Sequence, residues 1–194
     1  SSAHRRSGVP TRVCVTTAVM WSLCACLRKT MGLMVRLTDK ATDVVISGVS
    51  AGALAVYLTL DRWCERLRAV APSATCVGLP DSGFFLDYQA PGVTAQPPVS
   101  RAGDLCRDWR TPSLSLTGPS WLQAAGTFHA GLKWAFEAFN SSAGVNQRCQ
   151  SGHEGAPYLC NFAEHVAPFI TTPMFALQSQ YDGWQLGSVL ANGS

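Results

Sequence analysis

The chain has 194 residues, 47% of them hydrophobic, so it is long enough to bury a core as one domain. Its net charge of +3 is too small, and its basic residues are too dispersed, to indicate a nucleic-acid partner. Only 14% of the residues are charged, against roughly 25% in an ordinary soluble domain. The low charge predicts abundant buried surface, in a domain that is incomplete or has a partner.

The N-terminal segment carries a pattern with two interpretations. Arg5, Arg6 and Arg12 precede an apolar run at 13–27 that superficially resembles a secretory signal peptide, without a clear small-residue cleavage site. The run is too short and too polar to cross a membrane. We predict a buried helix over 17–31 instead. Residues 1–12 are expected to be disordered or spurious, which leaves 13–194 as the domain.

Strand and helix patterns then alternate as in an α/β protein. A short β-branched run predicts a buried strand at 43–47. Residues 51–68 predict a helix that is apolar all round in its first half and two-faced in its second half. Such a helix enters the core first and reaches solvent later. A second short strand is expected at 75–79, closed by Pro80.

The second half of the chain continues this order after an irregular stretch. Residues 88–119 are rich in Pro, Gly and Ser and indicate a long surface excursion. Ser120 is expected to cap a helix whose apolar spacing extends to Phe139. Asn161 is expected to open a shorter helix, and a third strand is expected at 174–177. The order predicts a mostly parallel sheet flanked by helices.

Eight cysteines favour an oxidising compartment. No pair has the CxxC spacing of a zinc site, and the closest pair, Cys24 and Cys26, has no histidine cluster beside it. Half-cystines are therefore a better interpretation than metal ligands. Two sequons, which begin at Asn140 and Asn192, agree with this, and we expect glycosylation at Asn140. These features predict a secreted or extracellular protein.

The chemistry begins at 48–52, a G-x-S-x-G pattern between a predicted strand and a predicted helix. In such a sharp turn Gly48 and Gly52 remove side chains that would clash. The turn raises the Ser50 hydroxyl above the sheet, and the Ala51 N–H points to where an acyl oxyanion would form. The alternative is a glycine-rich turn with an incidental serine. The strand and the apolar helix around the motif favour a nucleophile.

Two further stretches, L-P-D-S-G-F-F-L-D at 79–87 and Q-Y-D-G-W-Q-L at 180–186, follow predicted strands. Together with the G-x-S-x-G elbow, they resemble the pectin acetylesterases of plants and the animal Notum carboxylesterases. Those families carry a G-x-S-A-G-G elbow, then D-[AS]-G-x-F-[LV]-D, then an acid in a Y-D-x-W-Q-like loop. Cys149 and Cys160 look like the family's C…C-F-F element. The resemblance covers about 43–190 and implies an α/β-hydrolase architecture, here expected to be incomplete.

The resemblance implies a serine carboxylesterase that hydrolyses acyl esters, above all acetyl esters, through an acyl-enzyme. Ser50 would be the nucleophile, and Asp182 would orient the catalytic histidine. Without the resemblance, Asp182 would be interpreted as a turn aspartate before Gly183. The substrate would be an acetylated polysaccharide or an acylated protein, and no metal or organic cofactor is implied. The resemblance also implies a disulfide between Cys149 and Cys160.

Other residues of these motifs are expected to support the site. Phe84 and Phe85 are candidates for an acyl pocket, although aromatic residues beside a strand are more often core. Asp81 and Asp87 are candidates for structural hydrogen bonds and not for catalysis. Gln185, together with the preceding tryptophan, is expected to fix the loop.

Two positions differ from the family's pattern. Ala53 stands where the family usually has a second glycine, and we expect tighter packing under the elbow. Pro80 stands where the family tends to have Ser or Ala.

The chain also lacks two parts of the expected machinery. In α/β-hydrolases the triad follows the order Ser, acid, His, yet only 12 residues follow Asp182 and none is a histidine. His129, His153 and His165 precede it; we predict a core or helix-surface position for the first and surface positions for the others. A Gly-rich loop for the second oxyanion donor is also missing. We therefore expect a fragment or an imperfect gene model, with marginal esterase activity on its own.

Two other classes of protein stay open. One is a non-catalytic binding or interaction protein that keeps the hydrolase scaffold, and sequence beyond Ser1 and Ser194 would distinguish it. The other is a different serine acyl-hydrolase, such as a lipase or a peptidase. Activity on acetyl esters but not on amides would distinguish that class.

Overall fold

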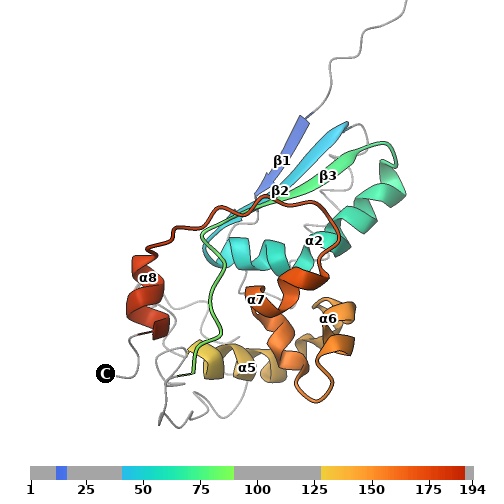
Figure 1. Cartoon of the computed structure of the whole chain (residues 1–194). Coiled ribbons are helices and arrows are strands. Elements are labelled where there is room, and N and C mark those ends of the chain that lie inside the picture. The colour runs from blue at the N-terminus through green and yellow to red at the C-terminus, as the bar shows by residue number, and fades with distance from the viewer. Residues whose placement is uncertain (1–11, 17–40, 90–127, 191–194) are drawn as a thin grey trace, which may run out of the picture.

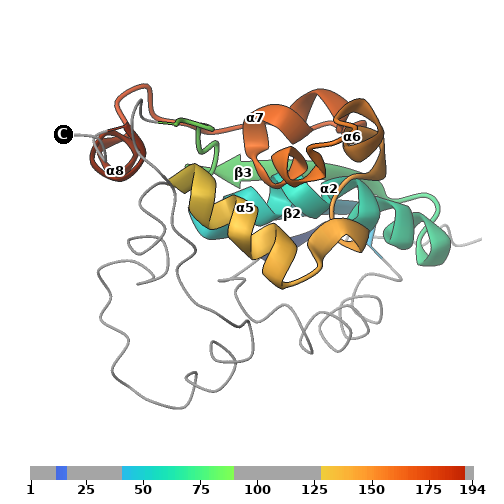
Figure 2. The same ribbon diagram turned by 90° about the horizontal axis from the view of Figure 1, so that it is seen from below.

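The computed structural model describes residues 12–16, 41–89 and 128–190. A small parallel sheet lies on one side of the long helix α2, and a group of shorter helices lies on the other side (Figures 1 and 2). This α/β arrangement agrees with the predicted fold class. The predicted helix at 17–31 and nearly all of the excursion at 88–119 lie outside the described residues.

The sheet consists of β1 (Arg12–Thr16), β2 (Asp43–Val49) and β3 (Thr75–Asp81), paired in parallel in that order. Val44 and Ile46 of β2 are buried and alternate with half-buried residues, as expected for a strand covered by a helix. The strands β2 and β3 were predictable from their composition. Strand β1 was not predicted, because four of its five residues lie within the apolar run at 13–27 and no pattern separates them from the rest of that run.

Pro80 shapes the other edge of the sheet. The predicted strand at 174–177 runs parallel to β3 but forms only two isolated bridges, Gly78 to Met174 and Asp81 to Leu177. The Gly78 N–H donates to Pro173, and the Ser82 N–H donates to Leu177. A parallel ladder requires a donor at position 80 between these two, and proline has none. The third predicted strand is therefore present only as an interrupted ladder, and β3 extends through Pro80 to Asp81.

Helix α2 (Ala51–Val70) ends two residues later than predicted. Its residues from Gly52 to Tyr57 are all buried, whereas Leu60, Cys64 and Leu67 form a single buried face further along. The first half lies between two cores. Leu54 and Tyr57 pack with the helical layer, and Val56 and Leu60 pack with the sheet. This double burial explains why the first half of the helix is apolar all round.

Asp61 fastens the middle of α2 to the segment before Met174. Its carboxylate accepts hydrogen bonds from the backbone N–H groups of Thr171 and Thr172, at 2.8–3.1 Å. Burial alone raises the pKa of Asp61, but these hydrogen bonds outweigh it and lower the pKa below its usual value.

The helical layer is built from short elements: α5 (Phe128–Ala138), η2 (Ser141–Ala143), α6 (Gln147–Gly152), η3 (Pro157–Asn161), α7 (Ala163–Val166) and η4 (Ala167–Phe169). The helix predicted after Ser120 is present as α5, whose described part begins at Phe128; the expected cap at Ser120 lies outside the described residues. The prediction for Asn161 was wrong. Asn161 ends η3, its side chain donates to the Leu132 carbonyl at 3.3 Å, and α7 begins at Ala163.

Two disulfides close loops within these layers. Cys149–Cys160 joins α6 to η3, as the family resemblance predicted, and both residues are fully buried. Cys64–Cys76 joins α2 to β3 and was not predicted. Among the described helices, none combines the length and the apolar character needed to cross a membrane.

Candidate active site

The G-x-S-x-G motif forms the sharp strand-to-helix turn expected of it. Ser50 follows β2 directly and occupies the N-cap position of α2 with φ of 56°, which is left-handed and costly for a residue other than glycine. Its N–H donates to the Asp81 carbonyl at 2.9 Å, and its own carbonyl accepts from Ala53 and Leu54. Gly48 and Gly52 are both buried, whereas Ser50 is exposed.

The Ser50 side chain is not used as a cap. An N-cap serine ordinarily accepts a hydrogen bond from a backbone N–H of the first turn, but Ser50 makes no such bond. An exposed serine that is held in a strained conformation and is not engaged as a helix cap is suited to a chemical role. Ala51, the next residue, carries the N–H proposed for the oxyanion.

The segment after β3 lies directly against the first turn of α2. A Cβ on Gly83 would lie 2.3 Å from the Ala53 Cβ and 2.5 Å from the Leu54 backbone nitrogen, so only glycine fits there. Ala53 is fully buried, in agreement with the tight packing expected under the elbow. Just before it, Ser82 donates its hydroxyl to Asp81 at 2.8 Å, so Asp81 forms the structural hydrogen bond predicted for it.

Asp182 is the N-cap of the short helix α8 (Gly183–Gln185). One carboxylate oxygen accepts from the backbone N–H groups of Trp184 and Gln185, and the other accepts from the side chains of Gln178 and Gln185. Slight burial raises the pKa of Asp182, but the four hydrogen bonds, those from Gln185 foremost, outweigh it and hold the pKa below its usual value. Asp182 is therefore an ionised carboxylate fixed by its own loop.

Two glutamines join the second and third motifs. Gln178 accepts from the Phe84 N–H at 3.0 Å, while Gln185 accepts from the Leu86 N–H at 3.0 Å and donates to the Phe84 carbonyl at 3.1 Å. Gln185 is buried, so these bonds are shielded from water. The prediction that Gln185 fixes the loop is confirmed, and Gln178 is a partner that the sequence did not single out.

Ser50 and the Asp182 loop share one edge of the sheet. Ser50 pairs with Asp81 at the carboxyl end of β3, and Ser82 pairs with Leu177, the last bridged residue of the neighbouring segment. Asp182 lies five residues beyond Leu177. The carboxyl edge of parallel strands is where open α/β sheets place their sites.

The two predicted pocket residues differ in their environment. Phe85 is buried and its ring contacts Phe128 and Trp184, with centroids 5.5 and 5.1 Å away, so it is part of the core. Phe84 is half-buried and packs edge-to-face on Tyr57 at 5.6 Å. Asn140, the predicted glycosylation site, is exposed in the turn after α5.

The described histidines bind partners elsewhere in the helical layer. His129 is buried and its Nδ1 bonds to Asp87, whose other oxygen bonds to His165 Nε2 at 3.0 Å. His165 and His153, for which surface positions were predicted, are half-buried. Asp87 forms structural hydrogen bonds, as predicted, but to two histidines that lie far from it in sequence.

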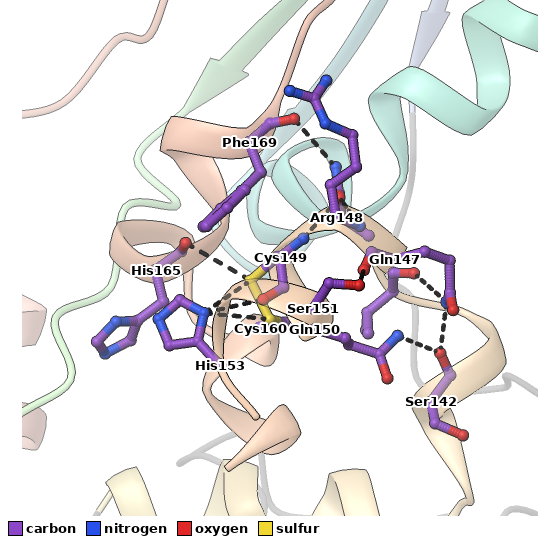
Figure 3. Close-up of a disulfide and its surroundings, with 12 residues drawn as sticks. Ser142, Gln147, Arg148, Cys149, Gln150, Ser151, His153, Cys160, His165 and Phe169 are labelled. Carbon is purple, nitrogen blue, oxygen red and sulfur yellow. Dashed lines mark hydrogen bonds between the residues drawn. A yellow bond between two sulfur atoms is a disulfide. The ribbon is translucent and has the colours of Figure 1, made fainter. Parts of the chain in front are cut away.

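His153 lies against the Cys149–Cys160 disulfide (Figure 3). Its Nδ1 is 3.6 Å from the Cys149 sulfur and 3.9 Å from the Cys160 sulfur, and it also bonds to the Cys149 carbonyl at 3.0 Å. These three residues have the spacing of a metal-ligand group. Both sulfurs are bonded to each other in the disulfide and cannot act as thiolate ligands, so the group holds no metal while the bond is intact.

A strand, a G-x-S-x-G elbow with an exposed serine and a following helix define the α/β-hydrolase class. The family model described as Pectinacetylesterase matches residues 27–98 and 124–194. The chain therefore belongs to the pectinacetylesterase family. The pectin acetylesterases that it resembles are carboxylic ester hydrolases.

Named relatives agree with this assignment. The chain is 28% identical to pectin acetylesterase 7 of Arabidopsis thaliana over 82% of its own length and 32% of that protein. It is 27% identical to the palmitoleoyl-protein carboxylesterase notum1a of Danio rerio, over 76% of the chain and 25% of that protein. The chain thus spans about a third or less of the length of these relatives.

Comparison with solved structures identifies the same family of folds. The crystal structure of the Wnt deacylase Notum from Drosophila superposes with a TM-score of 0.58 at 19% identity. The match covers 83% of this chain and 38% of the Notum chain. The α/β-hydrolase-like fold inferred from the sequence is therefore confirmed.

Proposed function

We propose that this chain carries the nucleophile of a serine carboxylesterase that hydrolyses acyl esters, acetyl esters first, on polysaccharide or protein. The observation that supports it most is Ser50, exposed and in a strained conformation with its hydroxyl unused by the helix cap. Family membership supports the chemistry, because the named relatives are acetylesterases and a protein carboxylesterase.

In the proposed reaction a histidine takes the proton of the Ser50 hydroxyl, and the oxygen attacks the ester carbonyl. The Ala51 N–H, at the N-terminus of α2, stabilises the oxyanion that forms. The ester's alcohol leaves with the proton from the histidine, and Ser50 keeps the acyl group. Water then attacks the acyl-enzyme, releases the acid and returns the proton to Ser50. No resident metal or organic cofactor takes part.

Asp182 is the proposed acid that orients the histidine. A carboxylate has about four acceptor positions, and the hydrogen bonds from Trp184, Gln178 and Gln185 already fill four. An imidazole N–H would therefore replace one of these donors. The side chain of Gln178 is the partner outside α8, and we propose that it moves when the histidine binds.

We propose that the histidine comes from beyond these 194 residues. Within the part of the chain that the structure describes, His129 and His165 bind Asp87, and His153 binds the disulfide region. All of them also precede Asp182, against the usual chain order. On this proposal, the 194-residue chain alone has marginal activity, since a triad lesion leaves roughly 10³–10⁴-fold catalysis over water. A secreted location is part of the same proposal and is supported by two disulfides.

The nucleophile is tested by labelling with a fluorophosphonate probe in the longest protein that contains this chain. We expect Ser50→Ala to abolish labelling and Ser82→Ala to leave it intact. Ser82 is a matched control because it also has positive φ in a neighbouring turn. Equal labelling of the Ser50→Ala protein would refute the assignment.

Turnover of p-nitrophenyl acetate by the 194-residue chain tests the origin of the histidine. We expect little hydrolysis above that of Ser50→Ala. Robust hydrolysis that depends on Ser50 would show that a histidine within the chain serves as the base. Hydrolysis of an anilide as fast as the acetate would favour a peptidase instead.

A further inference from the structure

Three potential metal ligands converge at the junction of the segment after β3 and helix α7. His165 Nε2 lies 3.0 Å from Asp87 Oδ2 and 3.4 Å from Glu164 Oε1. All three ligand atoms lie within 4.8 Å of one another. Two ligands of a tetrahedral zinc ion at 2.0–2.2 Å lie about 3.3–3.6 Å apart. The separations of His165 Nε2 from the two carboxylate oxygens are therefore already near those that a bound ion requires.

The charges at this junction are unbalanced. The two carboxylates, Asp87 and Glu164, face the imidazoles of His129 and His165, so negative charge remains unless both rings are protonated. The Asp87 side chain is only 8% exposed, which makes the excess charge costly there. Among the described residues, only histidines form ion pairs with Asp87 and Glu164. A divalent cation would balance the two carboxylates and leave the imidazole neutral.

Asp87 is held in place by a residue outside the ligand group, as is typical of metal ligands. Asp87 uses Oδ2 toward His165, while Oδ1 is held by His129, a buried residue of α5. Hydrogen bonds of this kind fix a ligating carboxylate and are often essential to affinity. The ring of His129 is itself stacked on Phe162, with centroids 5.5 Å apart, so its position is fixed by packing.

We propose that Asp87, Glu164 and His165 bind a divalent transition-metal ion, with Zn²⁺ as the representative ion. The site has an entrance, because the side chains of Glu164 and His165 are 30% and 27% exposed. An imidazole nitrogen favours Zn²⁺ or Co²⁺ over Ca²⁺ and Mg²⁺, which prefer oxygen ligands only. Three protein ligands leave a fourth position for water.

The ion would join two parts of the chain that are far apart in sequence. Asp87 follows the Phe84–Phe85 segment, and Glu164 and His165 belong to α7. Binding would therefore stabilise the folded chain and hold that segment in place. This role is independent of the proposed esterase chemistry, because it concerns structure and not the reaction of Ser50.

The second ligand group, Cys149, His153 and Cys160, lies close by, with the rings of His153 and His165 5.4 Å apart. Zinc binding by this group can be separated from binding by Asp87, Glu164 and His165 through the redox state of its cysteines. The intact disulfide excludes zinc from that group, so of the two groups found in the described part of the chain, binding by the oxidised protein reports on Asp87, Glu164 and His165.

The test is titration of the metal-stripped, oxidised protein with Zn²⁺ by calorimetry, with native mass spectrometry for stoichiometry. We expect one ion per chain, a higher melting temperature with Zn²⁺, and no competition from Ca²⁺. Glu164→Gln and His165→Gln should each weaken binding by at least about tenfold, and His129→Gln by about 10–100-fold. Glu164→Gln alters a half-exposed side chain, so it tests the site without removing buried packing.

Two matched variants serve as controls. Glu137→Gln removes an exposed acid that pairs with Lys133 on α5, and His153→Gln removes the neighbouring imidazole; both should bind Zn²⁺ like the parent. The proposal is wrong if the oxidised protein binds no ion, or if Glu164→Gln and His165→Gln bind as tightly as the parent. Binding that arises only after reduction of the disulfide, or that is lost in His153→Gln, would assign the metal to the cysteine group and also overturn it.

Discussion

Gly83 is the position where a single methyl group should disturb the candidate site most. In Gly83→Ala the new Cβ would lie 2.3 Å from the Ala53 Cβ, 2.5 Å from the Leu54 nitrogen and 2.7 Å from the Ala53 carbonyl carbon. Two of these three atoms belong to the backbone of the first turn of α2. A side-chain rotation cannot relieve such contacts, so the helix or the segment after β3 must shift.

The cost follows from this geometry. Overpacking of a core typically costs about 1–3 kcal/mol, and a backbone clash places Gly83→Ala toward the upper end, at about 2–3 kcal/mol. With a urea m-value of about 2–3 kcal/mol/M, the unfolding midpoint should fall by about 1 M. The shift also moves the turn that presents Ser50, so labelling by a fluorophosphonate should slow.

Urea unfolding monitored by tryptophan fluorescence measures the change in stability. Gly183→Ala is the matched control, since a Cβ there meets no atom within 4 Å and alanine favours the helix. Adding Ala53→Gly to Gly83→Ala removes the 2.3 Å contact and should recover part of the loss, with a coupling energy of about 1 kcal/mol. If Gly83→Ala unfolds at the same midpoint as Gly183→Ala, Gly83 does not approach the first turn of α2 this closely.

Three further outcomes are expected. The double variant Cys149→Ser/Cys160→Ser should lose about 3 kcal/mol in urea unfolding, because the disulfide no longer restricts the unfolded chain; an unchanged midpoint would contradict this. Asp61 has a lowered pKa, so its contribution to stability is present above about pH 4 and is lost as the pH falls. Asp61→Asn should therefore flatten the loss of stability between about pH 6 and about pH 3, and an unaltered pH profile would count against its role. Gln185→Leu should cost about 1–3 kcal/mol, since the N–H of Leu86 and the carbonyl of Phe84 would lose their partner, and a neutral effect in thermal unfolding would refute that.

Local pattern was enough to predict the elements that hold the nucleophile. The β-branched run before Gly48, the motif around Ser50 and the apolar helix after it are contiguous, so their structure depends mainly on their own residues. The all-round apolar character of the first half of α2 correctly indicated burial on two sides. The Cys149–Cys160 pairing came from the family resemblance, because spacing alone does not select one pairing among eight cysteines.

The contacts that unite distant segments could not be predicted in this way. Asp87 meets histidines 42 and 78 residues away, and which of several acids and histidines pair is decided by packing between layers. His165 looked like a surface residue because its short helix has no clear apolar face. The interrupted ladder beside β3 depends on Pro80, whose missing donor matters only once the neighbouring segment is known.

The positions of the two disulfides have a consequence for how the molecule is joined together. Each bridges residues only 12 or 11 positions apart, one within 41–89 and the other within 128–190. Between these two halves, the described contacts are all non-covalent, and they include the backbone bonds of β3 to 173–177 and the side-chain bonds of Asp61, Gln185 and Asp87. A cut between the halves would therefore leave both of these disulfides intact, with only non-covalent contacts joining the described residues on its two sides. With the halves expressed as two polypeptides, the extent of their reassembly would report directly on the strength of these contacts.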